Sequence, residues 1–355
     1  MSSSIVEKNF KLEQLIEQDL KRNVKKIDAE AFYAESFLRK LGKAGLFSSV
    51  NKSQKEVLLD EMQVVEETAK TCMTTAFCLW CHLAALTYVR HTGNKTLKNK
   101  MLASLENGEI LGATGLSNPM KYYAGLEKLH MNAKPIEGGY ILSGVLPSVS
   151  NLGENHWFGL IAGVDDNKRI MCFIPCNAKG LKLKEKVNYL GINGSATYAC
   201  SFTDVFVPYE WILSEDADTF VKEIRPAFIS YQIPLGLGVT QASITSIERV
   251  RRKQNDCNRF LRVQSENLQE KEHKIQGKLR ILLSSEILNW KKVANIRLEA
   301  AYLTLEAVQA SMLHNGSAGY LQDSAPSRRL REAYFFANLT PTVKHLEKLL
   351  HNTPL

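Results

Sequence analysis

The hydrophobic pattern of the chain changes its period twice, and this limits the possible folds more than any other feature. Up to about residue 107, apolar residues such as Phe37 and Leu41 recur at steps of three and four, as in amphipathic helices. From residue 110, short runs rich in β-branched and aromatic residues follow, separated by turn sequences such as Gly138-Gly139. After residue 211 the helical spacing returns. This order predicts segregated domains rather than alternating βα units.

With 355 residues, the chain is long enough for two or three domains. We expect an α+β multidomain fold with an N-terminal helical domain over residues 1–109, a middle β-barrel or sandwich domain over 110–213 and a C-terminal helical bundle over 214–355. The predicted strands are 110–116, 128–133, 140–146, 157–162, 169–174, 181–186 and 197–207. The predicted C-terminal helices are 226–252, 257–285, 287–314, 328–336 and 342–351. Segment 73–91 is apolar almost all round, which predicts a helix buried in a bundle.

Neither a membrane span nor a signal peptide is recognisable in the sequence. No run of about 18 uninterrupted apolar residues occurs, and residues 1–11 lack the apolar core of a signal peptide. The seven cysteines are odd in number and mostly embedded in apolar sequence, which suits reduced thiols better than a disulfide framework. We therefore expect a cytoplasmic protein with no membrane contact.

Residues 78–82, Cys-Leu-Trp-Cys-His, match the C-x-x-C-H pattern of c-type haem attachment. The pattern lies inside the apolar segment 73–91, and no export signal is recognisable. We therefore interpret both cysteines as small core residues and expect no metal site.

The formal net charge of +8 suits a phosphate-bearing cofactor or a CoA-like ligand, although by itself it discriminates little. The densest basic run, residues 249–253, is typical of a solvated helix face. No basic patch is interleaved with aromatic residues, so we expect no nucleic-acid partner.

Five segments carry the most specific signal. In chain order they are 112–119 (GATGLSNP), 138–151 (GGYILSGVLPSVSN), 190–208 (LGINGSATYACSFTDVFVP), 236–242 (GLGVTQA) and 316–333 (GSAGYLQDSAPSRRLREA). Taken singly, 112–119 fits a strand that ends in a polar turn, and Gly316 with Gly319 fits a helix C-cap. Taken together and in this order, the five resemble segments of the acyl-CoA dehydrogenase superfamily, and the resemblance covers nearly the whole chain.

The resemblance implies a flavin cofactor, FAD or, as the alternative, FMN. The implied cofactor-binding residues are Leu116, Ser117, Val149, Ser150, Gly316, Ser317 and Thr342. Ser117 stands where relatives have a threonine that bonds the pyrimidine end of the flavin, and Ser150 stands where a hydroxyl faces the nitrogen between the two redox carbons. In relatives the glycine loop at Gly316 approaches FAD bound to a neighbouring subunit, because glycine lets the backbone come close. The resemblance therefore also implies a homotetramer or a dimer.

The chain departs from the family pattern at the catalytic base. Relatives remove the α-proton of the thioester with a glutamate from one of two places, which are Thr340 and Phe228 here. Neither residue can act as that base, so the catalytic residues are unknown. Two cofactor features are also replaced: the glycine-rich loop near the pyrophosphate by residues 120–124, and an arginine element that reaches the neighbour's FAD by residues 254–257.

Three functions remain open. The first is an FAD-dependent oxidoreductase of the acyl-CoA dehydrogenase type, acting on an acyl thioester such as an acyl-CoA or on a similar small apolar substrate, with an electron-acceptor protein as partner. The second is a two-component flavin-dependent monooxygenase that receives reduced flavin from a partner reductase, since that reaction needs no α-proton base. The third is a non-catalytic scaffold without flavin.

Overall fold

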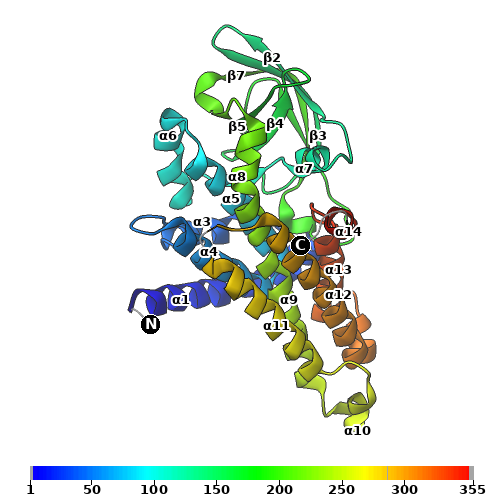
Figure 1. The fold of residues 1–355 in the computed structure, drawn as a ribbon. Helices are drawn as coiled ribbons and strands as arrows, with labels where there is room; N and C mark the ends of the chain where they lie inside the picture. The colour runs from blue at the N-terminus through cyan, green and yellow to red at the C-terminus, as the bar shows by residue number, and fades with distance from the viewer. Residues whose placement is uncertain (1–2, 286, 352–355) are drawn as a thin grey trace.

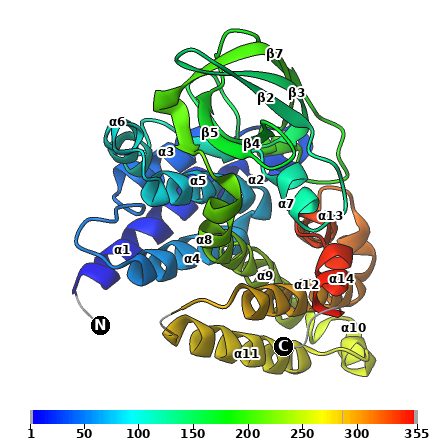
Figure 2. The ribbon, with the colours of Figure 1, turned by 45° about the horizontal axis from the view of Figure 1, so that its top comes forward.

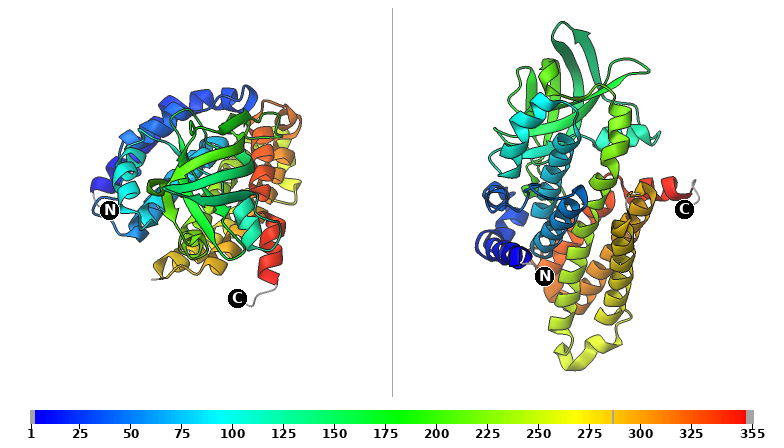
Figure 3. Two further views of the ribbon diagram at one scale, coloured as in Figure 1. Left: turned by 90° about the horizontal axis from the view of Figure 1, so that it is seen from above. Right: turned by 60° about the vertical axis from the view of Figure 1, so that its left-hand side comes forward.

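The structure, a computed structural model, describes residues 3–285 and 287–351. Helices form the two ends of the chain, and the segment between them forms one mixed β-sheet, as the two changes of period predict (Figure 1). Seen from above, the sheet lies between the N-terminal helices on one side and the last helices on the other (Figure 3). Within the described ranges, no helix is long and apolar enough to cross a membrane.

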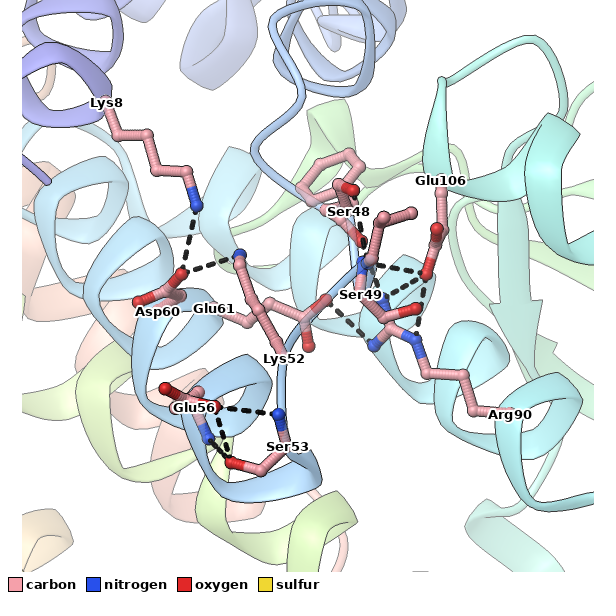
Figure 4. A network of polar contacts seen from close by, with 12 residues as sticks. Lys8, Ser48, Ser49, Lys52, Ser53, Glu56, Asp60, Glu61, Arg90 and Glu106 are labelled. Carbon is pink, nitrogen blue, oxygen red and sulfur yellow. Dashed lines mark hydrogen bonds and ion pairs between the residues drawn. The ribbon is translucent and has the colours of Figure 1, made fainter. Parts of the chain in front are cut away.

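The N-terminal region is a set of packed helices. They are α1 (Ser3–Leu15), α2 (Val24–Ala29), α3 (Glu35–Lys43), α4 (Gln54–Thr71), α5 (Met73–His91) and α6 (Lys95–Glu106), with a π-helical turn at Ile16–Leu20 and a 3₁₀ turn at Lys21–Asn23 after α1. A capping box begins α4: the Glu56 N–H donates to Ser53 Oγ at 3.2 Å, and the Ser53 N–H donates to Glu56 Oε2 at 2.7 Å (Figure 4). This exchange satisfies two donors that an uncapped helix would leave free.

Helix α5 is the buried helix that segment 73–91 predicts. All of its side chains from Met73 to Val89 are buried. Cys78 and Cys81 are free thiols within it, which agrees with their interpretation as core residues. His82 is also buried: its Nδ1 accepts the Gly112 N–H at 2.9 Å and its Nε2 lies 3.2 Å from the Leu105 carbonyl oxygen. Burial lowers the pKa of His82 to about 3, so the ring is neutral and joins α5 to two neighbouring segments.

The middle region is an eight-stranded sheet with the order β6-β7-β3-β2-β4-β5-β8, in which β1 pairs with β4 off this path. Its strands are β1 (Gly112–Thr114), β2 (Met131–Ile136), β3 (Gly139–Val149), β4 (Trp157–Gly163), β5 (Arg169–Pro175), β6 (Leu181–Glu185), β7 (Tyr198–Pro208) and β8 (Ile212–Ser214). Helix α7 (Ser117–Tyr123) follows β1, and 3₁₀ turns lie at Asn193–Ser195 and Tyr209–Trp211. The pairs β1–β4 and β2–β4 are parallel and the others antiparallel. The sheet has a core of its own, which includes Leu142, Phe158 and Val205.

The C-terminal region is a helical bundle below the sheet (Figures 1 and 2). Its helices are α8 (Ala217–Ser230), α9 (Ile233–Val250), α10 (Lys253–Asp256), α11 (Ser265–Ser284), α12 (Trp290–Tyr320), α13 (Ala325–Asn338) and α14 (Val343–His351), with a 3₁₀ turn at Cys257–Phe260. Side-chain caps from Asp216, Asn289 and Ser324 begin α8, α12 and α13.

Several expected boundaries in this chain were wrong. The predicted helix 226–252 is divided between two helices, α8 and α9. Pro234 lies in the first turn of α9, the position in a helix where the missing N–H of proline breaks no hydrogen bond, so a new helix starts there. The predicted helix 257–285 starts only at Ser265. Residues 316–320, expected as a loop, continue α12, and only Gly316 leaves the helical conformation, with φ +57° and ψ −139°. The polar turn expected after β1 is the short helix α7.

One half-buried carboxyl, that of Glu66, lies where α4 faces α9 and α11. Gln241 Nε2 donates to Glu66 Oε1 at 3.0 Å, and Glu272 and Lys70 are close enough to influence the Glu66 charge. Burial raises the pKa of Glu66 to about 7, against 4.5 for the free side chain. The folded state therefore holds a proton between about pH 4.5 and 7 that the unfolded chain releases, and stability falls as the pH rises through this range.

We predict that Glu66→Gln removes this loss. Gln stays neutral, so between pH 5 and pH 8 the free energy of unfolding of the variant rises relative to that of the wild type by on the order of 1–2 kcal/mol. Urea unfolding at the two pH values measures the difference. Glu13→Gln, at an exposed position of α1, is the matched control and should follow the wild type. If the free energies of unfolding of the wild type and of Glu66→Gln change equally between the two pH values, the raised pKa of Glu66 is contradicted.

Candidate functional site

The seam between the sheet and the bundle brings several of the predicted site residues together. Ser117 is the first residue of α7, and Thr340 lies in the turn between α13 and α14. Their hydroxyl oxygens are 3.0 Å apart. Thr342 belongs to the same turn, and its Oγ1 accepts the His345 N–H at the start of α14. Leu116, next to Ser117, is fully buried. Segments more than 200 residues apart in sequence thus meet at one hydroxyl pair.

Ser150 belongs to a second group of hydroxyls at the end of β3. Its Oγ lies 2.7 Å from Thr197 Oγ1, which lies 2.7 Å from Ser195 Oγ. Val149 is buried and pairs with Tyr198 in the ladder between β3 and β7. The Ser195 carbonyl accepts the Cys78 thiol of α5 at 3.6 Å, so this group lies against the buried helix. Ser150 itself is half-buried.

Gly316 and Ser317 lie elsewhere. Both are exposed near the end of α12, at the far end of the bundle beside α10 (Figure 1). The Asn258 side chain donates to the His314 carbonyl at 3.1 Å and ties this end of α12 to the 3₁₀ turn that follows α10. The chain therefore does not bring Gly316 and Ser317 to the Ser117–Thr340 seam.

The second base position is filled by an aromatic cluster. Phe228 is 2% exposed, and its ring contacts Trp80 edge to face with 4.9 Å between centroids. The Trp80 indole N–H donates to the Phe228 carbonyl at 3.0 Å. Phe77 stacks on Trp80 and contacts Phe335 of α13. An apolar, well-packed environment surrounds the place from which some relatives supply the base.

Of the acids near these two positions in the sequence, Glu347 and Glu332 are bonded elsewhere. The Glu347 carboxylate accepts the Tyr302 hydroxyl at 2.7 Å on the exposed side of α14. Glu332 accepts the Thr74 N–H and hydroxyl at 3.1 and 3.0 Å and pairs with Arg328, which fastens α13 to the start of α5. Glu223 is exposed and lines a cavity next to α5 and α6.

A buried guanidinium lies behind Thr340, and the sequence reasoning missed it. Arg297 is fully buried, donates to Gln232 Oε1 at 3.0 Å and to the Phe336 carbonyl at 2.7 Å, and stacks 3.5 Å from the Phe336 ring. Gln232 in turn donates to the Thr340 carbonyl at 2.9 Å. Burial lowers the pKa of Arg297 to about 9. Its sequence signal was a charged residue on an otherwise apolar helix face.

A small cavity of about 40 Å³ adjoins the Thr340 turn, next to Pro341. Its wall contains His345, which is 4% exposed and has no hydrogen-bond partner for either ring nitrogen within the described part of the chain. Burial lowers the pKa of His345, so the ring is neutral near pH 7. The Arg225 guanidinium stacks 3.7 Å over the Trp290 ring at the same cavity. The cavity thus presents a guanidinium and an imidazole, and its described lining residues include no carboxylate.

The described ranges contain no cluster of three or more His, Cys, Asp and Glu side chains that could hold a metal ion. The chemistry available at the seam is therefore that of hydroxyls, one imidazole and two arginines.

Comparison with known proteins agrees with this architecture. The family model "Acyl-CoA dehydrogenase, N-terminal domain" matches residues 11–109. The chain is 28% identical over 222 residues to the short-chain specific acyl-CoA dehydrogenase of Clostridium acetobutylicum, a match that covers 58% of each protein. It is 24% identical over 343 residues to the mitochondrial short-chain enzyme of Sus scrofa, covering 89% of this chain and 82% of that protein.

Among solved structures, butyryl-CoA dehydrogenase from Megasphaera elsdenii superimposes with a TM-score of 0.86 over 99% of this chain and 98% of that one, at 17% identity. At this identity the likeness shows the fold alone. Together with the sequence matches to the N-terminal domain and along most of the chain, it leads to one conclusion. The chain belongs to the acyl-CoA dehydrogenase superfamily.

Proposed function

We propose that this protein is an FAD-dependent oxidoreductase of the acyl-CoA dehydrogenase type, acting on an acyl thioester or a similar small apolar substrate. The observation that carries the proposal is the Ser117–Thr340 seam, where α7 and the turn before α14 meet beside a cavity. This cavity is small and lined in part by Met120 and Ile229, which favours a compact apolar group.

The residues present fit the ring end of a flavin. Ser117 is exposed at the seam and Ser150 is half-buried at the end of β3, so neither hydroxyl is closed off from a ligand while its other hydrogen bond stays within the protein. Bound FAD would supply the hydride acceptor. Ser150 would donate a hydrogen bond to the ring nitrogen, with its hydroxyl oriented by Thr197 and Ser195, and such a fixed donor stabilises negative charge on the reduced ring.

The fit is poorer at the pyrophosphate end. The segment that replaces the glycine-rich loop is the end of helix α7, and its Lys121 is paired with Glu127 at 2.8 Å. We therefore keep FMN as the alternative cofactor.

A second function has its own support. The two base positions hold a buried phenylalanine and a threonine, and Glu347 is bonded to Tyr302. A monooxygenase that receives reduced flavin from a partner reductase does not remove a proton from carbon. That reaction is therefore compatible with a site that has no carboxylate at either base position. Under the first function the partner is instead an electron-acceptor protein.

We further propose a homo-oligomer, a tetramer or at least a dimer. The C-terminal bundle exposes several large apolar side chains, which are Phe260, Ile281, Tyr302, Leu313, Tyr320 and Leu321. Exposed apolar side chains in such number favour a protein–protein interface.

Light scattering on the purified protein tests the assembly. We expect two or four times the chain mass of 39.9 kDa at micromolar concentration. Leu313→Glu combined with Tyr320→Glu should shift the mass downward, because a buried charge in an interface is costly. Phe10→Glu, at an exposed apolar position of α1, is the control. A monodisperse wild-type monomer would reject the oligomer.

Replacing Ser150 tests the flavin site. Ser150→Ala should weaken flavin binding by roughly 0.5–1.5 kcal/mol, or about 2- to 12-fold, because one hydrogen bond to the ring is lost. Titration of the apoprotein with FAD and with FMN, followed by flavin fluorescence, measures the change. Ser143→Ala on the same strand is the matched control, since its hydroxyl faces Asp204 instead. Unchanged affinity and redox potential in Ser150→Ala would show that this strand end does not contact the ring.

The missing base leads to a kinetic prediction. Short- and medium-chain acyl-CoAs should reduce the flavin bound to the wild-type protein slowly, because a general base contributes about 10²- to 10⁴-fold to the rate of such a step. Thr340→Glu should raise the anaerobic bleaching rate. Colourless protein that binds reduced flavin and slows its oxidation would support the monooxygenase, and protein that binds no flavin in either form would support a scaffold.

Glu347→Gln is the control for this assay, and it should leave the wild-type rate unchanged. Fast bleaching by the wild type that disappears in Glu347→Gln would identify Glu347 as the base and refute the prediction.

A further inference from the structure

A second cavity, of about 630 Å³, lies between the N-terminal helices and the bundle. It is bounded by α4, the end of α5, α6, α8, the end of α11 and residues 287–290. Its size falls within the range of small-molecule sites. Trp290 lines both this cavity and the smaller one beside Thr340, but Ser117 and Thr340 do not line the larger one. It is a separate place in the fold.

The walls of this cavity are apolar over much of their area. Side chains from five of the surrounding segments contribute, namely Val57, Leu58, Leu102, Ala227, Leu283 and Leu288. Burying an aliphatic chain against such walls is favourable by about 0.8 kcal/mol for each methylene group removed from water.

Arg90 and Tyr231 line the cavity, and we call the polar network that joins them its floor; Figure 4 shows the part around Arg90. Arg90 donates to Glu61 at 2.9 Å, to Glu106 at 3.1 Å and to the Phe47 carbonyl at 2.7 Å. The Tyr231 hydroxyl donates to the other Glu61 oxygen. Arg90 is paired with both Glu61 and Glu106, so the floor offers no free cation to a ligand.

The cationic side chains at the wall are different. Lys55 and Lys222 are exposed, and Lys98 donates to the Arg90 carbonyl at 2.6 Å. None of the three has a carboxylate partner within the described part of the chain, whereas Lys52 is paired with Asp60 (Figure 4). Glu223 is the one acid that lines the cavity within that part. Among the described lining residues, three lysines without a carboxylate partner thus stand against one glutamate, and their net charge is positive.

We propose that this cavity binds an amphipathic carboxylate, a single aliphatic chain that ends in an anionic head. The chain lies along the leucine and valine walls, and the carboxylate lies among Lys55, Lys98 and Lys222. The floor stays closed beneath the ligand because its charges are already paired. The site is additional to the flavin seam and does not depend on the proposed reaction.

The test is a calorimetric titration of the full chain with decanoate below its micellar concentration, with decanol and acetate as the two half-ligands. We expect saturable binding of decanoate, weaker binding of decanol and no binding of acetate in the same range. Lys55→Gln combined with Lys222→Gln should weaken decanoate by about three- to tenfold, in line with exposed charge pairs, and leave decanol unchanged. Lys184→Gln, on the exposed strand β6, is the matched control.

A second variant tests whether the aliphatic chain of the ligand lies in this cavity. Ala227→Phe fills the cavity from α8 and should abolish binding of both decanoate and decanol, with an unchanged circular dichroism spectrum as the check on folding. The absence of saturable decanoate binding to the wild type overturns the proposal. So does binding that survives Ala227→Phe and the double lysine variant but is lost in His345→Gln, because that result places the ligand in the smaller cavity.

Discussion

The burial of α5 over its whole circumference is the constraint on which the other parts of the structure depend. A helix with no solvated face has to be covered on every side, and this chain covers it with parts of all three regions. His82 contacts the first strand and α6, Trp80 bonds α8, and Thr74 bonds Glu332 of α13. The sheet and the bundle therefore meet next to α5, and the Ser117–Thr340 seam lies where they meet.

Polar groups inside this core are tolerated because nearly all of them are paired. Arg90 lies between two glutamates, and Glu332 is held by Thr74 and Arg328. Removing one partner of such a group would leave a buried charge, which costs far more than the pair contributes. The exceptions include Arg297, which has no carboxylate partner within the described ranges and whose pKa is lowered by burial. Its bonds to Gln232 and Phe336 also support the turn that carries Thr340, since Gln232 holds that turn by the Thr340 carbonyl.

The seam combines retained and replaced chemistry. Ser117 and Ser150 carry the hydroxyl groups that the proposed flavin site requires. The place expected for a proton-abstracting base on α8 carries no acid. Phe228 stands there and packs against Trp80. This combination supports flavin chemistry more strongly than it supports α-proton abstraction.

The sequence by itself determined the fold class, the three-part order and the buried helix, because hydrophobic period and turn residues are local properties of a chain. It also singled out Ser117, Ser150, Thr340 and Gly316 by resemblance. Only the tertiary structure decided which of these meet: Ser117 lies 3.0 Å from Thr340, whereas Gly316 lies at the far end of α12. It also decided that Arg297 is buried behind Thr340 and that α4, α5 and α8 enclose a cavity with unpaired lysines. Such features arise from contacts between residues distant in sequence, and no local pattern in a single chain encodes those contacts.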